Sequence, residues 1–126
     1  MIFISGMLLT FKTRNMRPRL EILKDIVGIN GDLSTLQNEI LEYPWDIAEP
    51  LLSIGKKDIL AVLNRFIEKL ITAADLEEWA NMIECRDDLG FDEERQQDAI
   101  FTLANPDLNG NITEDAVKRI IDELSD

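Results

Sequence analysis

The amino-acid sequence predicts an all-α protein, a compact bundle of about six short to medium helices. From residue 20 onward, apolar residues recur almost everywhere with the spacing of one face of a helix. After residue 12, no alternation of β-branched and polar residues indicates a β-hairpin. The 126 residues, 45% of them hydrophobic, are enough for one domain with its own core. We therefore expect a single helical domain over residues 20–126, after a basic and apolar extension over residues 1–19.

The extension begins with an apolar run over residues 1–10, and residues 11–19 then carry four bases and no acid. A secretory signal has its bases before the apolar run, and this run is about half the length that crosses a bilayer. We interpret it as a short edge strand or as an extension upstream of a later start, at Met7 or Met16. A cytoplasmic protein is expected.

The first two helices of the domain follow directly. One apolar face stops at Gly28, and a second must end before Pro44, because proline disfavours helix in the residue before it. The third helix has the strongest pattern of the chain. The three faces consist of Leu20, Leu23, Ile26 and Val27; of Leu33, Leu36, Ile40 and Leu41; and of Ile59, Leu60, Leu63, Phe66, Ile67 and Leu70.

The last three helices carry start or stop signals. Thr72 followed by Asp75 predicts a capping box, Asn105-Pro106 closes the fifth helix, and Thr113 caps the sixth. Their apolar faces consist of Leu76, Trp79, Ala80 and Ile83; of Ala99, Ile100, Leu103 and Ala104; and of Val117, Ile120, Ile121 and Leu124.

Charge and composition limit the classes of function that the protein can have. The chain has a net charge of −12, and residues 72–126 alone hold sixteen acids and four bases. This excess of acids argues against nucleic acid and anionic membranes as binding partners and favours a basic protein. In the alternative interpretation, the acidic surface only keeps the protein soluble. There is no histidine and one cysteine, which removes histidine catalysis, disulfide frameworks and nearly all transition-metal sites. We expect no catalytic residues, no metal and no cofactor.

A first candidate binding segment is Tyr43-Pro44-Trp45-Asp46, between two predicted helices. Tyrosine and tryptophan often anchor interfaces because they bury large rigid areas and keep a polar end. In the alternative interpretation, Trp45 fills the end of the bundle and Tyr43 covers a helix terminus.

The second candidate is the acidic segment over residues 84–98, with seven acids and two arginines. We expect Gly90 to end a helix or turn and Asp92 to cap the next helix, with Arg86 pairing locally. Cys85 is predicted to be a small buried packing residue. The predicted partner-binding residues of both segments are Tyr43, Trp45, Asp46, Glu84, Asp87, Asp88, Asp92, Glu93 and Glu94.

A third segment, residues 105–113, resembles a calcium loop in its spacing of asparagine, aspartate and glycine. With Gly110 at the sixth position, however, Ala116 occupies the twelfth, where the bidentate glutamate belongs. We therefore predict a turn rather than a metal site.

The run from Leu76 to Phe91, followed by Leu103-Ala104-Asn105-Pro106, resembles small helical bacterial proteins. The shared features are a tryptophan–alanine helix, an acid–arginine–acid–acid turn and the leucine–alanine–asparagine–proline helix end, within residues 55–107. Several such proteins are similar to immunity proteins encoded beside the toxins of contact-dependent growth inhibition systems. The acidic helical immunity proteins of nuclease colicins are similar in class only, so no inhibitory residues carry over.

The resemblance implies an immunity protein that binds and neutralises a secreted toxin domain, such as a nuclease. An acidic helical adaptor that docks a basic subunit of an assembly is the alternative. An enzyme that uses paired carboxylates with a hard ion is the weakest hypothesis, because no acid pair stands out in a cleft-forming motif. The sequence leaves the oligomeric state open.

Overall fold

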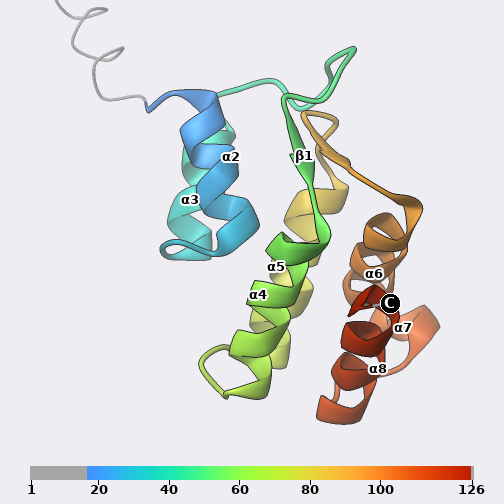
Figure 1. Ribbon diagram of the computed structural model, residues 1–126. Helices are drawn as coiled ribbons and strands as arrows, with labels where there is room; N and C mark the ends of the chain where they lie inside the picture. Colours follow the sequence, from blue (N-terminus) through green and yellow to red (C-terminus); the bar gives the residue numbers. More distant parts are fainter. Residues whose placement is uncertain (1–16, 126) are drawn as a thin grey trace, which may run out of the picture.

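The computed structural model describes residues 17–125, and the all-α prediction is confirmed (Figure 1). The described residues form seven helices and two short strands. In chain order they are α2 (Arg19–Gly28), α3 (Leu33–Ile40), β1 (Leu52–Ile54), α4 (Lys56–Ile67), α5 (Ala73–Glu84), β2 (Leu89–Phe91), α6 (Glu94–Ala104), α7 (Pro106–Asn109) and α8 (Glu114–Ser125). The strands and α7 were not predicted. The predicted edge strand or extension over residues 1–16 lies outside the described residues.

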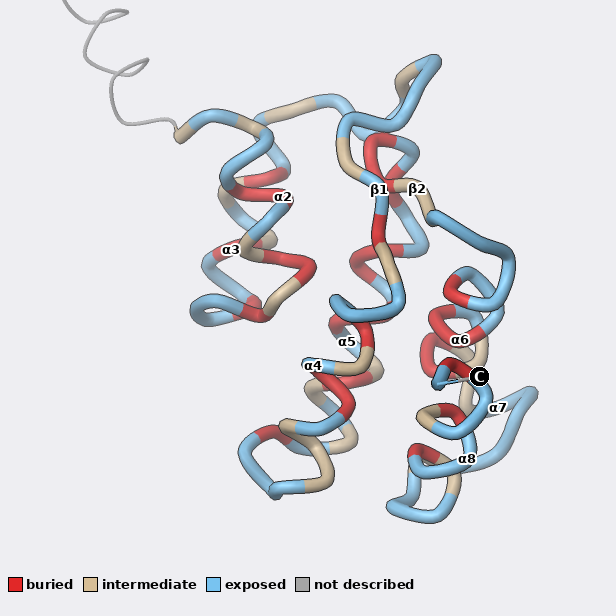
Figure 2. The backbone as a smooth tube through the Cα atoms, viewed as in Figure 1, coloured by how far each residue is buried: buried red, intermediate tan, exposed pale blue. Residues whose placement is uncertain are grey.

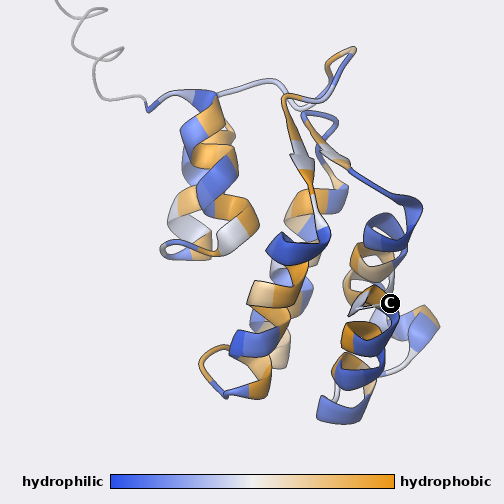
Figure 3. Ribbon diagram, viewed as in Figure 1, coloured by the Kyte–Doolittle hydropathy of each residue, from blue (hydrophilic) through white to orange (hydrophobic). Residues whose placement is uncertain are grey.

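Helix α5 holds the centre of the bundle, where it packs against α2, α3, α4 and α6. The α2–α3 pair lies on one side of it, and α8 packs against α4 and α6 on the other (Figure 1). Buried positions of the helices face inward and exposed positions outward (Figure 2). The hydropathy of the residues follows the same division (Figure 3), as expected when amphipathic helices bury one apolar face each.

The two strands form a small parallel sheet, in which Leu52 pairs with Leu89 and Ile54 with Phe91. Each strand has three residues, which is too short for the alternation typical of a strand to be recognised in the sequence. Gly90 lies in β2, so the prediction that it ends a helix or turn is wrong. A Cβ atom at this position would lie 2.9 Å from Cγ of Pro50, which explains a glycine where another segment crosses so closely.

The helix signals at Thr72 and Thr113 are confirmed. The Thr72 hydroxyl accepts a hydrogen bond from the amide of Asp75, whose carboxylate accepts one from the amide of Thr72. Thr113 accepts one from the amide of Ala116. Asp92 does not cap α6, because its carboxylate accepts a hydrogen bond from the hydroxyl of Ser53 instead.

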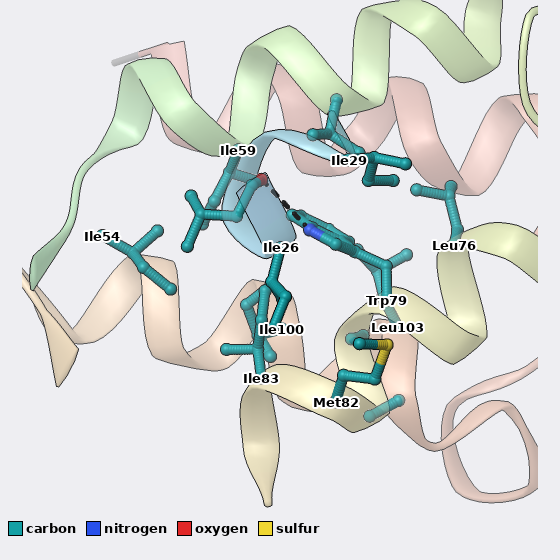
Figure 4. Close-up of a cluster of buried hydrophobic side chains, with 14 of the residues drawn as sticks. Ile26, Ile29, Ile54, Ile59, Leu76, Trp79, Met82, Ile83, Ile100 and Leu103 are labelled. Carbon is teal, nitrogen blue, oxygen red and sulfur yellow. Dashed lines mark hydrogen bonds between the residues drawn. The ribbon is translucent and has the colours of Figure 1, made fainter. Parts of the chain in front are cut away.

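Trp79 occupies the middle of the core, as its helical face predicts, and is fully buried. Its indole Nε1–H donates to the carbonyl of Val27 at 3.1 Å, which joins α5 to the last turn of α2 (Figure 4). Branched aliphatic side chains from the surrounding helices pack around it. Cys85 is exposed at the end of α5, so the prediction that it is a buried packing residue is wrong.

The folded domain begins before residue 20. Arg17 forms ion pairs with Glu21, Asp25 and Glu39, each at 2.8 Å, and thereby links α2 to α3. These carboxylates raise the pKa of Arg17, with the hydrogen bond to Glu39 as the largest cause. The same hydrogen bond lowers the pKa of Glu39 below its ordinary value. Arg17 and Arg19 therefore belong to the helical body, and not to an extension that ends at residue 19.

Candidate functional site

A buried ion pair lies at the centre of the acidic segment. Arg86 donates from Nε and Nη2 to the two carboxylate oxygens of Asp88, both at 2.9 Å. Asp88 is 0% exposed and Arg86 is 8% exposed. The expectation that Asp88 belongs to an exposed recognition surface is therefore wrong. Its carboxylate balances a buried guanidinium, as a buried charge requires, and Arg86 does pair locally, as the sequence predicted.

The same arginine connects the two predicted binding segments. Its Nη2 also donates to the carbonyl oxygens of Pro44, at 2.9 Å, and Tyr43, at 3.3 Å. The amide of Asp87 donates to the carbonyl oxygen of Trp45 at 2.9 Å. These contacts fix the aromatic segment against the end of α5. The sequence did not predict these contacts, because Arg86 lies about forty residues from the carbonyl groups and the order of side chains does not indicate which main-chain carbonyl an arginine will bind.

The two aromatic residues of the first candidate segment have different environments. Tyr43 is half-buried, its hydroxyl donates to the carbonyl oxygen of Arg17 at 2.5 Å, and the guanidinium of Arg19 lies 5.2 Å from the centre of its ring. These internal contacts fit the interpretation in which Tyr43 covers a helix terminus. Trp45 is 56% exposed, so the interpretation in which it fills the end of the bundle is wrong. Asp46 beside it is also exposed.

The remaining predicted acids lie together around a groove of about 890 Å³. We call this hollow the acidic groove. Its rim carries the exposed carboxylates of Glu84, Asp87, Asp92, Glu93, Glu94 and Asp98. Its apolar lining includes Ile47, Pro50, Phe91 and Phe101. Arg95 pairs with Glu93 at 3.3 Å. Arg86, the one base among the described residues that line the groove, is neutralised by Asp88.

A second hollow, of about 560 Å³, adjoins the acidic groove, and Arg86 lines both. We call it the Trp45 cleft. Its apolar lining consists of Leu41, Trp45, Met82 and Cys85, and its acidic lining of Glu77 and Glu78. The predicted site residues do not include Leu41, Glu77, Glu78 or Met82. They lie on α5 and at the end of α3, and the packing of these helices brings them to Trp45.

The predicted turn over residues 105–113 begins with the short helix α7 and continues through Gly110, whose φ is 95°. The side-chain amides of Asn105 and Asn109 donate to the carbonyl oxygens of Phe101 and Asn105, so both are used in local structure. Between residues 17 and 125, no group of three acidic or cysteine side chains is arranged to hold a metal ion. No helix in this range is long and apolar enough to span a bilayer.

Comparison with known proteins finds no matching family model, no matching curated protein and no matching solved structure. The fold and the site define the molecule as a small acidic all-α protein with two adjoining surface hollows. One hollow is rimmed by carboxylates, and the other is walled by an exposed tryptophan.

Proposed function

We propose that this protein is an immunity protein that binds a secreted bacterial toxin domain through the acidic groove and thereby neutralises it. The observation that supports this most directly is the rim of six exposed carboxylates around one groove. Arg95 pairs with one of them, Glu93, and the one base among the described residues that line the groove, Arg86, is neutralised by Asp88. Such a surface fits a partner with a concentrated positive charge.

A nuclease toxin has that charge, because its substrate is a polyphosphate that lysine and arginine must neutralise. A protector must also associate quickly, before the toxin acts. Opposite charges steer the two surfaces together and raise the association rate far above that of neutral partners. The acidic groove supplies the steering charge, and its apolar lining supplies surface that gains free energy when it is covered.

The groove is also held in shape before any partner arrives. Ile47, Ala48 and Pro50 line the groove and closely follow the Pro44 carbonyl to which Arg86 donates. The main-chain oxygen of Asp88 accepts hydrogen bonds from the amides of Leu51 and Leu52. A preformed surface loses less conformational entropy on binding. Tight association then depends on how well the groove and the partner surface match in shape and charge, and the groove does not have to fold first.

The test uses the C-terminal domain of any large secreted protein encoded directly upstream as the candidate toxin. Growth of cells that express this domain is measured with and without the protein, and association rates are measured by stopped flow at low and high salt. We expect Glu84→Gln/Asp87→Asn to slow association several-fold at low salt, and high salt to reduce that difference. Asp115→Asn/Asp122→Asn removes the same charge from α8, outside the groove, and is expected to have a much smaller effect.

Equal effects of the two double variants would refute the acidic groove as the binding surface. A complex that forms with the expected charge dependence but leaves growth inhibited would favour the adaptor. An adaptor needs the same acidic surface but does not need to cover an active site.

A further inference from the structure

We propose that the Trp45 cleft binds an arginine side chain of the basic partner, with the guanidinium stacked on the indole of Trp45 and facing Glu77 and Glu78. The inference deepens the proposed function, on which it rests for the presence of a basic partner. It adds a second contact of different chemistry beside the acidic groove, at residues that the charge pattern of the sequence does not single out.

Trp45 is an exposed residue on a main chain that hydrogen bonds hold in place. The residue is 56% exposed. The amide of Asp87 donates to its carbonyl oxygen, and Arg86 donates to the carbonyl oxygen of Pro44 just before it. Because the main chain that carries the indole is already fixed, binding costs less main-chain entropy. Tryptophan is one of the residue types that most often dominate interface energetics.

The lining of the cleft matches the two parts of an arginine side chain. Leu41, which is 63% exposed, and Met82 line it beside Trp45 and offer apolar contact for a methylene stem. Glu77 and Glu78 offer the opposite charge, and neither forms an ion pair with any described residue. A purely apolar side chain in the cleft would offer these two carboxylates no opposite charge.

Arginine fits better than lysine for geometric reasons. The guanidinium is planar, is more weakly hydrated than an ammonium group and stacks on aromatic rings. It also has several donors in one plane and can therefore stack on Trp45 while it donates to a carboxylate. Within the molecule, Arg19 already lies over the ring of Tyr43, which shows the same pairing at a neighbouring aromatic residue.

The experiment titrates the isolated protein with ethylguanidinium and follows the two indole N–H signals by heteronuclear NMR. Trp79 is an internal control, because its indole is fully buried and donates to Val27. N-Ethylurea, which has a similar shape without the charge, is the control ligand. Salt is kept at about 0.15 M, where charges separated by more than roughly 8 Å are largely screened.

We expect ethylguanidinium to shift the Trp45 signal saturably and to leave the Trp79 signal in place, with N-ethylurea much weaker. Glu77→Gln/Glu78→Gln is expected to reduce the affinity several-fold, whereas Glu84→Gln/Asp87→Asn in the acidic groove changes it little. The proposal is overturned if both indoles shift alike, if N-ethylurea acts like ethylguanidinium, or if the Glu77/Glu78 variant binds as the wild type does.

This titration contains no toxin, so its outcome is independent of the proposed function. With a toxin complex in hand, Trp45→Leu, which keeps an apolar side chain but removes the ring, is expected to speed dissociation and leave the association rate nearly unchanged. An unchanged dissociation rate would show that the complex does not use the cleft, even if the toxin is neutralised.

Discussion

The substitution Asp88→Asn tests the buried ion pair that connects the acidic segment to the aromatic segment. Asparagine keeps the size of the side chain and removes its charge. The guanidinium of Arg86, 8% exposed, then remains buried without its carboxylate, and Arg19, whose Nη1 lies 3.7 Å from Oδ2 of Asp88, loses the same partner. Removal of one member of a buried pair costs about 3–5 kcal/mol, which is a large part of the roughly 5–15 kcal/mol by which domains are stable.

The free energy of unfolding is measured by urea denaturation, followed by far-ultraviolet circular dichroism. Asp87→Asn is the matched control: it makes the same chemical change one residue earlier, at an exposed carboxylate, and we expect it to cost less than about 1 kcal/mol. The double variant Arg86→Met/Asp88→Leu is expected to be more stable than Asp88→Asn, because it removes the buried guanidinium of Arg86 together with its carboxylate. If Asp88→Asn costs no more than Asp87→Asn, the ion pair does not stabilise the fold as argued.

Three further substitutions test single contacts. Gln96 is 2% exposed and its Oε1 accepts no hydrogen bond from the described residues. Gln96→Met is therefore expected to raise the free energy of unfolding by about 1 kcal/mol, and a loss of stability would show that this oxygen is not an unsatisfied buried acceptor. Thr72→Ala removes the cap of α5 and is expected to cost about 1 kcal/mol in urea denaturation, with Thr72→Ser near wild type. Because Arg17 lowers the pKa of Glu39 in the folded state, the stabilisation from this pair is present above the ordinary pKa of about 4.5 and is lost as the pH falls through the lower folded value. Glu39→Gln is therefore expected to be less stable than wild type at neutral pH, and the difference should shrink below pH 4.5; a difference independent of pH would refute this.

The sequence by itself determined six of the seven described helices and most of the core. The faces that contain Ile59, Trp79 and Val117 have the helical period, and all three residues are fully buried. The start signals at Thr72 and Thr113 also form as predicted. These features depend on residues within a few positions of one another, where spacing along the chain and spacing in space are linked by the geometry of the helix.

The tertiary structure alone decided which acids are available to a partner. Asp87 and Asp88 are neighbours with the same side chain, yet one is exposed and the other is fully buried against Arg86. It also exposed Trp45, for which the sequence left both an interface and the end of the bundle open, and brought Glu77 and Glu78 beside it. Exposure and long-range pairing depend on segments far apart in the sequence, such as β1 and β2. Local pattern does not encode such contacts, because it is the packing of the whole chain that creates them.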